Sequence, residues 1–308
     1  MSRRGWVLFV AMGIIWGVPY LLIKVAVREV SPAFLVLMRT GGGALLLVPA
    51  AVLKGQLRPV LKFWKPLVAY TAVEMGGPWI LLFQAEKRLP SSLSGLLIAA
   101  VPLAGALLAW VTRSDRLDRR RVVGLVIGFA GVALLVGFSV GHSDLWAAAS
   151  IGGVVVGYAL GPWIVAHHLA DAPPLGVVAA SLLLCALAYV PIAAFQLPHH
   201  ALKAAEVESI VGLTVLCTAA AFLLFFALIA EVGAYRATII TYVNPAVAVL
   251  LGVTVLSEPF GWATATGFVL IVVGCFFATG RASRQERAPA DSESTALDSP
   301  RPIVNTDL

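Results

Sequence analysis

Residues Ser209 to Ala230 read SIVGLTVLCTAAAFLLFFALIA, a continuous apolar run that indicates the fold class. It contains no Asp, Glu, Lys or Arg. A helix rises about 1.5 Å per residue, so a segment of this length crosses a hydrocarbon core of about 30 Å. The sequence therefore predicts a membrane-spanning helix here.

The composition of the whole chain agrees with this segment. Of its 308 residues, 60% are hydrophobic and 12% are charged, whereas soluble domains carry about 25% charged residues. The mean hydropathy is +0.93, and a water-soluble fold of this size could not bury so much apolar surface. The net charge of +6 does not indicate a nucleic-acid partner, because the basic residues lie in short loops between apolar runs.

Charges, prolines and polar clusters divide the chain into ten apolar segments of spanning length. The fold class is therefore an all-α membrane protein with ten transmembrane helices. The expected spans are 5–26, 32–53, 66–85, 91–112, 122–141, 145–166, 174–196, 209–230, 235–256 and 260–280. Residues 281–308 are rich in Ser, Pro, Ala and charge, which predicts a disordered cytoplasmic tail.

The distribution of Lys and Arg predicts the orientation. Basic residues are concentrated in the loops on the side of the N-terminus, at 54–65 and 113–121, and are sparse in the alternate loops. Cytoplasmic loops carry this excess of positive charge. We expect a multi-pass protein of the plasma or inner membrane with both termini in the cytoplasm.

The chain also resembles itself at a shift of 143 residues. Pro102 then aligns with Pro245, Gly124 with Gly267, and Gly131 with Gly274. The sequence predicts two repeats of five helices, at 5–141 and 145–280. Five is an odd number, so the second repeat enters the membrane in the opposite orientation. Inverted repeats are typical of alternating-access transporters.

Several short motifs resemble those of EamA-type members of the drug/metabolite transporter superfamily. They are IWGVPY at 15–20, Arg39 in the second span, AVPL at 100–103, VNPA at 243–246, and LSEP at 256–259. Their order and spacing match over residues 5–280. The second half departs from the pattern, because Tyr158 stands where Trp16 stands in the first.

The resemblance implies a central cavity and the export, or occasionally the uptake, of small metabolites, amino acids or drugs. It implies a small-molecule substrate and a lipid bilayer as partners. A homodimer is compatible with the sequence, and we expect no enzymatic activity and no cofactor. The three cysteines lie far apart within apolar runs, which predicts no metal site.

Two ionisable residues lie within predicted spans. Glu74 is near the centre of the third span, where a charge costs at least about 2.5 kcal/mol on insertion scales. It is a candidate proton carrier or partner of a cationic group. Arg39 in the second span is a candidate site for a substrate carboxylate. The alternatives are a structural pair between the two, or an Arg39 that extends to the membrane interface.

Backbone features and aromatic residues suggest a cavity near these charges. Gly76, Gly77 and Pro78 weaken the third helix at mid-membrane and free backbone groups, which are tolerated where they line a cavity. Trp16, Trp79 and Tyr158 are candidate wall residues, although packing is the commoner role of a single aromatic residue.

The ninth span carries a polar stripe of Thr238, Thr241, Tyr242 and Asn244, which indicates either a hydrated cavity or hydrogen bonds between helices. Gly17, Pro102 and Pro245 are predicted structural positions. Lys24 and Glu86 lie at span ends, which predicts interfacial anchoring.

The leading hypothesis is thus a secondary transporter in which two halves rock around a central site, coupled to protons through Glu74. A membrane-embedded enzyme or a lipid-translocating protein is the second hypothesis. A channel is the third, and a duplicated single chain argues against it.

Overall fold

The computed structural model describes residues 2–114, 118–139, 144–198, 200–233 and 237–279, with only the backbone for Thr238 and Ile239. The predicted tail at 281–308 lies outside these residues. Within the described part the chain is helical and has no strand. Nine of its helices there are long and apolar enough to cross a membrane, and Ile240–Leu256 is a shorter apolar helix. The ten predicted spans correspond to these nine and the shorter one.

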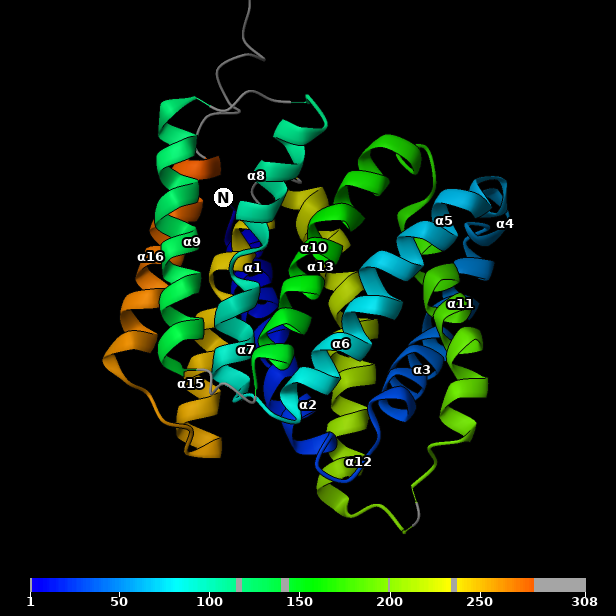
Figure 1. Ribbon diagram of the computed structural model, residues 1–308. Helices are drawn as coiled ribbons and strands as arrows, with labels where there is room; N and C mark the ends of the chain where they lie inside the picture. The colour runs from blue at the N-terminus through cyan, green and yellow to red at the C-terminus, as the bar shows by residue number, and fades with distance from the viewer. Residues whose placement is uncertain (1, 115–117, 140–143, 199, 234–236, 280–308) are drawn as a thin grey trace, which may run out of the picture.

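Several spans consist of more than one helical segment (Figure 1). The described elements of the first half are α1 (Arg3–Gly17), α2 (Pro19–Ala26), α3 (Pro32–Leu53), α4 (Leu57–Val60), η1 (Leu61–Phe63), α5 (Trp64–Tyr70), η2 (Thr71–Gly76), α6 (Gly77–Glu86), α7 (Ser91–Ile98), α8 (Val101–Val111) and α9 (Arg119–Ser139). Those of the second half are α10 (Leu145–His168), α11 (Pro174–Ala194), α12 (Ala204–Val211), η4 (Gly212–Ala220), α13 (Ala221–Val232), η5 (Thr238–Tyr242), α15 (Asn244–Leu256) and α16 (Trp262–Thr279).

Prolines explain where several spans are divided. Pro19, Pro78, Pro102 and Pro245 all occupy the first turn of a helical segment. Proline has no backbone N–H and suits this position, where that donor has no partner within the helix. The first, third, fourth and ninth spans are therefore interrupted where these prolines lie.

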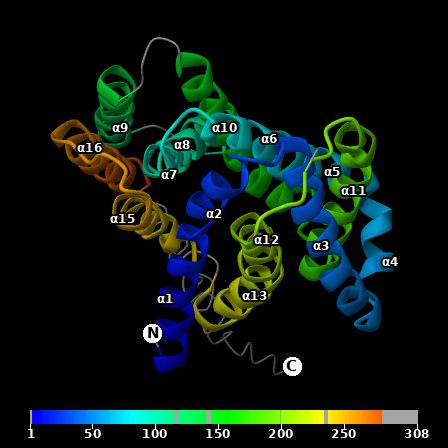
Figure 2. The ribbon, with the colours of Figure 1, turned by 90° about the horizontal axis from the view of Figure 1, so that it is seen from below.

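The helices pair across the two halves of the chain. The pairs are α9 with α16, α3 with α11, α6 with α10, α7 with α15, and α1 with α13. Figure 2 shows α9 and α16 at one side of the bundle and α3 and α11 at the other, together with α4 and α5, and α1, α2, α12 and α13 lie between the two sides. Each pair joins one helix before residue 140 to one after residue 144.

Glycines permit the closest of these approaches. A Cβ on Gly131 would lie 2.8 Å from the carbonyl oxygen of Gly267, and a Cβ on Gly124 would lie 2.7 Å from that of Gly274. Real side chains do not fit at such distances, so the backbones of α9 and α16 touch directly. Small residues serve the same purpose at many membrane helix interfaces.

Large apolar side chains cover the outside of the bundle. Leu53 is 88% exposed, Trp146 77% and Phe195 90%. Burying such a side chain is worth about 1.5–3 kcal/mol relative to water. Their number and size indicate contact with lipid.

The bundle has two ends, which we call the N-terminal face and the opposite face. The N-terminus lies at the first, together with the start of α9 (Figure 1). At the second lie the ends of α2, α6 and α15 and the starts of α7 and α12.

Candidate functional site

A cavity of about 580 Å³ lies between the two halves. Segments from eight of the predicted spans contribute to it, from α1 and α2 through η2, α8, α10 and η4 to η5 and α16. Its lining includes Trp16, Tyr20, Arg39, Glu74, Trp79, Ile98, Pro102, Gly105, Tyr158, Pro162, Cys217, Phe222, Phe225, Thr241, Tyr242, Asn244 and Thr279. Aromatic and apolar side chains dominate the wall, as in most small-molecule sites.

Nearly all the residues predicted for substrate binding or coupling line this cavity. They are Trp16, Arg39, Glu74, Trp79, Tyr158, Thr241, Tyr242 and Asn244. The side chain of Thr238, predicted with them, lies outside the described residues. Among the predicted structural positions Pro102 lines the cavity, whereas Gly17, Gly76, Gly77, Pro78 and Pro245 are not part of its lining.

Glu74 projects from a distorted part of the third span. Thr71–Gly76 forms a π-helical segment with a wider turn than an α-helix, and such segments occur frequently at functional sites. The carboxyl packs on Gly161 of α10, where any Cβ would collide with it. Its Oε2 atom is buried and has no hydrogen-bond partner among the described residues.

A side chain of α11, which the sequence did not reveal, contacts the end of this π-helical segment. The Tyr189 hydroxyl of α11 donates a hydrogen bond of 2.8 Å to the carbonyl oxygen of Gly76. This hydrogen bond joins the junction of η2 and α6 to α11. The predicted weakness at Gly76 to Pro78 is therefore present, and it begins earlier, at Thr71.

Arg39 is fixed from two directions and is only 7% exposed. Its Nε donates to the Thr218 hydroxyl at 2.9 Å. The guanidinium carbon lies 3.8 Å from the centre of the Trp79 ring, a distance at which a cation is attracted to the ring face. Arg39 therefore lies deep in the bundle and does not extend to the interface.

Arg39 and Glu74 do not pair with each other. No ion pair joins them among the described residues; Glu29 forms such contacts, with Lys203 and His200. Trp79 contacts the guanidinium on one side and hydrogen bonds to the Tyr158 side chain on the other. The cavity thus contains a cation and an acid, both without a partner of opposite charge in the described part of the chain.

A second wall comes from α1, α13 and α15. Trp16 packs against Phe225, with ring centres 4.7 Å apart, and against Phe222 at 6.2 Å. With its amide oriented to satisfy its neighbours, Asn244 donates to the carbonyl oxygens of Gly13 (3.1 Å) and Ile240 (3.0 Å). Asn244 therefore joins the start of α15 to α1.

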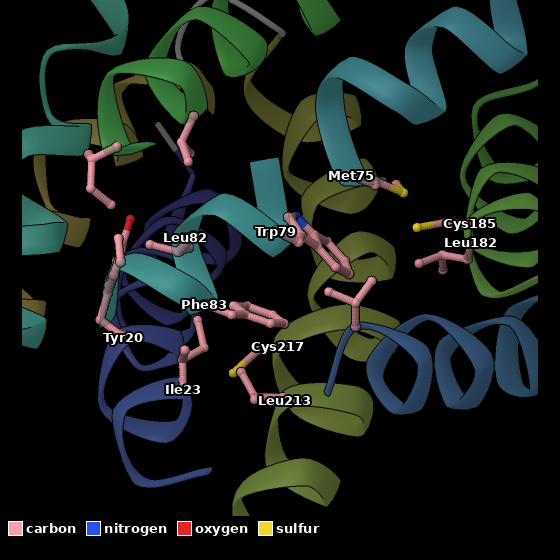
Figure 3. Close-up of a cluster of buried hydrophobic side chains, with 14 of the residues drawn as sticks. Tyr20, Ile23, Met75, Trp79, Leu82, Phe83, Leu182, Cys185, Leu213 and Cys217 are labelled. Atoms are coloured by element: carbon pink, nitrogen blue, oxygen red, sulfur yellow. The ribbon is translucent and has the colours of Figure 1, made fainter. Parts of the chain in front are cut away.

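The cavity is closed toward the opposite face by a layer of buried side chains. Ile23, Phe83 and Leu213 have no exposed surface, and Figure 3 shows Phe83 beside Cys217 and Leu213. We call these three residues and Leu82 the plug. Toward the N-terminal face the lining is more accessible, since Pro162 is exposed and Gly105 and Thr279 are partly exposed.

Polar contacts hold the opposite face together beyond the plug. Glu258 accepts hydrogen bonds from the backbone N–H groups of Ser91 (2.7 Å) and Ser92 (2.9 Å). Burial raises the pKa of Glu258, but the hydrogen bonds from Ser92 and Ser91 outweigh it and leave the pKa below its ordinary value of 4.5. Its negative charge also lies at the positive end of the α7 dipole.

A third contact at this face joins two loops. Glu29 accepts from Lys203 at 3.0 Å and contacts His200 at 3.2 Å. Hydrogen bonding to Lys203 and its charge lower the pKa of Glu29. Both groups are solvated, so this pair contributes little to stability.

Glu86 differs from the predicted interfacial anchor. Its side chain is completely buried, and neither carboxyl oxygen has a hydrogen-bond partner among the described residues. Lys24 Nζ instead donates to the backbone oxygens of Glu86 (2.6 Å) and Leu89 (2.8 Å). The prediction failed because a position near the end of a span can still lie beneath a loop.

The two halves of the chain each match the same known protein family. The family model described as the EamA-like transporter family matches residues 3–137 and again residues 145–280. The chain belongs to the EamA-like transporter family. The protein is therefore a membrane transporter, and the family resemblance predicted from its motifs is confirmed.

Relatives from three organisms carry transporter names. The chain is 24% identical over 280 residues to the uncharacterized transporter YvbV of Bacillus subtilis, covering 89% of this chain and 91% of the relative. It is 26% identical over 258 residues to the uncharacterized inner membrane transporter YedA of Escherichia coli, covering 79% of each. An uncharacterized transporter of Archaeoglobus fulgidus is 22% identical over 276 residues, covering 89% of this chain and 98% of that one.

A solved structure shares the fold of this EamA-like chain. It is described only as the crystal structure of a protein, and it aligns with a TM-score of 0.65 at 21% identity. The alignment covers 92% of this chain and all of the other. The helical architecture is thus one that occurs in a known structure.

Proposed function

We propose that this protein is a secondary transporter that exports a small amphipathic solute by alternating access. The observation that carries the proposal is the cavity in which Arg39 and Glu74 both face the same space without pairing. Charges without partners are expensive in a membrane and usually mark a substrate or ion pathway.

The chemistry of the lining favours a zwitterion with an apolar body, such as an amino acid. The Arg39 guanidinium suits a carboxylate, and the Glu74 carboxylate suits an ammonium group. Trp79 and Tyr158 lie between them, and Trp16 with Phe225 would contact the apolar part. A volume of about 580 Å³ falls in the usual range for small-molecule pockets.

The sidedness of charge supports export as the direction. The loops at the N-terminal face carry most of the basic residues, which favours a cytoplasmic location for that face. The lining of the cavity is more accessible toward that face, which supports a state that loads substrate from the cytoplasm. Release then requires the plug and the opposite face to open.

Glu74 is the proposed coupling residue. Its carboxyl lies at the cavity wall between the two halves, against Gly161. An acid in this position can accept a proton from one side of the membrane and release it to the other as access alternates. Competition between the proton and the ammonium group of the substrate for one carboxylate would couple the two movements.

The helix pairing supports two inverted five-helix repeats. In the two halves, α1 corresponds to α10 and α6 corresponds to α13. If the halves are equivalent, a contact of α1 with α13 requires a contact of α10 with α6, and both contacts are present. Around such an axis the substrate site lies near mid-membrane.

The first test of export compares the small molecules in the medium of cells that express the native chain, the Glu74→Gln variant or an empty vector. The proposal predicts that one solute accumulates outside only with the native chain. Equal export by the variant would remove Glu74 from the cycle. No difference from the empty vector would contradict export of a cellular metabolite.

A second test separates the two charges. Purified protein in lipid nanodiscs is titrated with L-phenylalanine, phenethylamine and 3-phenylpropanoate, which share a ring and differ in their ionic groups. We expect L-phenylalanine to stabilise the protein most. In Arg39→Gln it should stabilise the protein no more than phenethylamine does, because the partner of its carboxylate is lost. In Glu74→Gln it should stabilise the protein no more than 3-phenylpropanoate does, because the partner of its ammonium group is lost. Equal effects of all three ligands would contradict the proposed substrate class.

A further inference from the structure

The most isolated ionisable group in the described structure lies beyond the cavity, at Glu86. The exposed fraction of its residue is 0%. Both of its carboxyl oxygens are buried and have no hydrogen-bond partner among the described residues. The plug residues Leu82 and Phe83 precede it on α6, and Leu82 lines the cavity whereas Glu86 does not.

The charged and titratable groups around Glu86 do not neutralise it. Those that act on it are Lys24 and Tyr20 of the first span, Arg39 of α3, Tyr158 of α10, and Glu258 of the loop before α16. Lys24 is the nearest candidate partner, but its ammonium group is bound to two backbone oxygens. No ion pair within 4.0 Å reaches Glu86 in the described part of the chain.

A carboxylate buried without a partner is far costlier than a neutral carboxyl group, so such a group takes up a proton. The state seen here, with the opposite face closed, therefore favours the protonated form of Glu86. Once that face opens, water reaches the carboxyl group and lowers the free energy of its charged form.

We propose that Glu86 is a proton-binding site that controls opening of the opposite face. Binding of a proton favours the closed face, and loss of the proton favours the open one. This site is distinct from Glu74, which lies on the other side of the plug. The inference rests on the opening that the proposed transport cycle requires, but it does not depend on the substrate.

The experiment measures opening directly, with a cysteine at Val27. This residue ends the first span at the opposite face and is 3% exposed. The parent chain has its three cysteines, Cys185, Cys217 and Cys275, changed to Ala. Its five histidines, His142, His167, His168, His199 and His200, are changed to Gln, so that no native thiol or imidazole remains. The rate of maleimide labelling in nanodiscs is measured between about pH 5.5 and pH 8, where free carboxyls and lysines do not titrate.

Each rate is divided by the labelling rate of a Lys87→Cys variant. Position 87 is exposed at the same face, so this rate measures how the thiolate fraction changes with pH. For the parent with Val27→Cys we expect the ratio to rise as the pH rises, by up to about tenfold per pH unit for one proton. Glu86→Gln imitates the protonated group, so its ratio should be low and independent of pH. Glu208→Gln, at an exposed acid of α12 on the same face, should keep the pH dependence of the parent.

The outcomes distinguish this inference from the proposed function. A parent ratio that does not change with pH, or Glu86→Gln with the slope of the parent, would overturn the role of Glu86 alone. No labelling in any variant would contradict opening of this face, and with it alternating access. If Glu86→Gln does not fold, Glu86→Met, which is neutral and of similar shape, is read by the same criteria. Glu258 does not confuse the result, since its pKa lies below the measured range.

Discussion

At the residue scale, Gly161 determines where the Glu74 carboxyl can lie. A Cβ at this position of α10 would collide with the carboxyl group. We expect Gly161→Ala to displace Glu74 and to destabilise the protein by about 1–3 kcal/mol, as overpacking does. Transport should decrease with it.

Gly152 on the same helix is the matched control, because a Cβ there would meet nothing within 4 Å. Gly152→Ala should be neutral or stabilising by up to about 1 kcal/mol, since Ala is the better helix former. Thermal unfolding of the two purified variants checks the prediction. Equal effects would show that the space around Glu74 is not restricted.

Thr218 is the residue that holds Arg39 in place. We expect Thr218→Val to leave Arg39 Nε buried without an acceptor, which costs about 1–3 kcal/mol. The apparent Kd for an anionic ligand should rise as the guanidinium becomes misplaced. Thr214→Val on the same segment serves as the control, because the Thr214 hydroxyl has no hydrogen-bond partner among the described residues. A comparable loss in both variants would argue against a specific role for Thr218.

The sequence was informative about single residues wherever a charge or a polar group lies at mid-membrane. Glu74 and Arg39 are conspicuous for this reason. It was uninformative about Glu86, because burial of a residue at the end of a helix depends on which loop covers it. Thr218 was not found either, since its role depends on a contact between α3 and η4. The glycine spacing at 153, 157 and 161 predicts close helix packing, but the contact of Gly161 with Glu74 depends on how η2 packs on α10.

At the scale of the elements, the contact between Glu258 and the start of α7 joins two spans of different halves. Because the pKa of Glu258 is lowered, its stabilisation is present above the ordinary value of 4.5 and is lost as pH falls through the lower value in the folded protein. We expect Glu258→Gln to lower the Tm by a few degrees at neutral pH. The difference from the native chain should shrink below about pH 4.

Glu208→Gln is the control for charge at the same face, since Glu208 lies exposed in α12. Its Tm should follow that of the native chain at every pH. If the Glu258→Gln difference persists unchanged in acid, the stabilisation does not come from the charge of the carboxylate.

The elements themselves were largely predictable from apolar runs and prolines, because lipid demands continuous helical segments. The ninth span differs, since 3-10 geometry at Thr238–Tyr242 leaves α15 to begin at Asn244. The π-helical turns at Thr71–Gly76 and Gly212–Ala220 were also not predicted. Composition does not distinguish a wide turn from an α-helical one, because both bury the same apolar side chains.

At the scale of the whole molecule, the predicted orientation can be tested without a substrate. Lys62 lies exposed in η1, between the second span and α5, and Lys87 lies exposed at the opposite face. With the N-terminus in the cytoplasm, a membrane-impermeant maleimide added to intact cells should label Lys87→Cys and not Lys62→Cys. Permeabilised cells should show labelling of both, and the reverse pattern in intact cells would invert the direction proposed for transport.

The two π-helical turns occupy corresponding places in the two halves, since Thr71 and Gly212 begin them at nearly the repeat spacing. A wide turn of this kind marks a local lengthening of the helix. If the halves descend from one gene, a lengthening shared by both is older than the duplication. The ancestor would then have been a five-helix protein that inserted in both orientations and assembled as an antiparallel dimer, already carrying the irregular turn beside its central space.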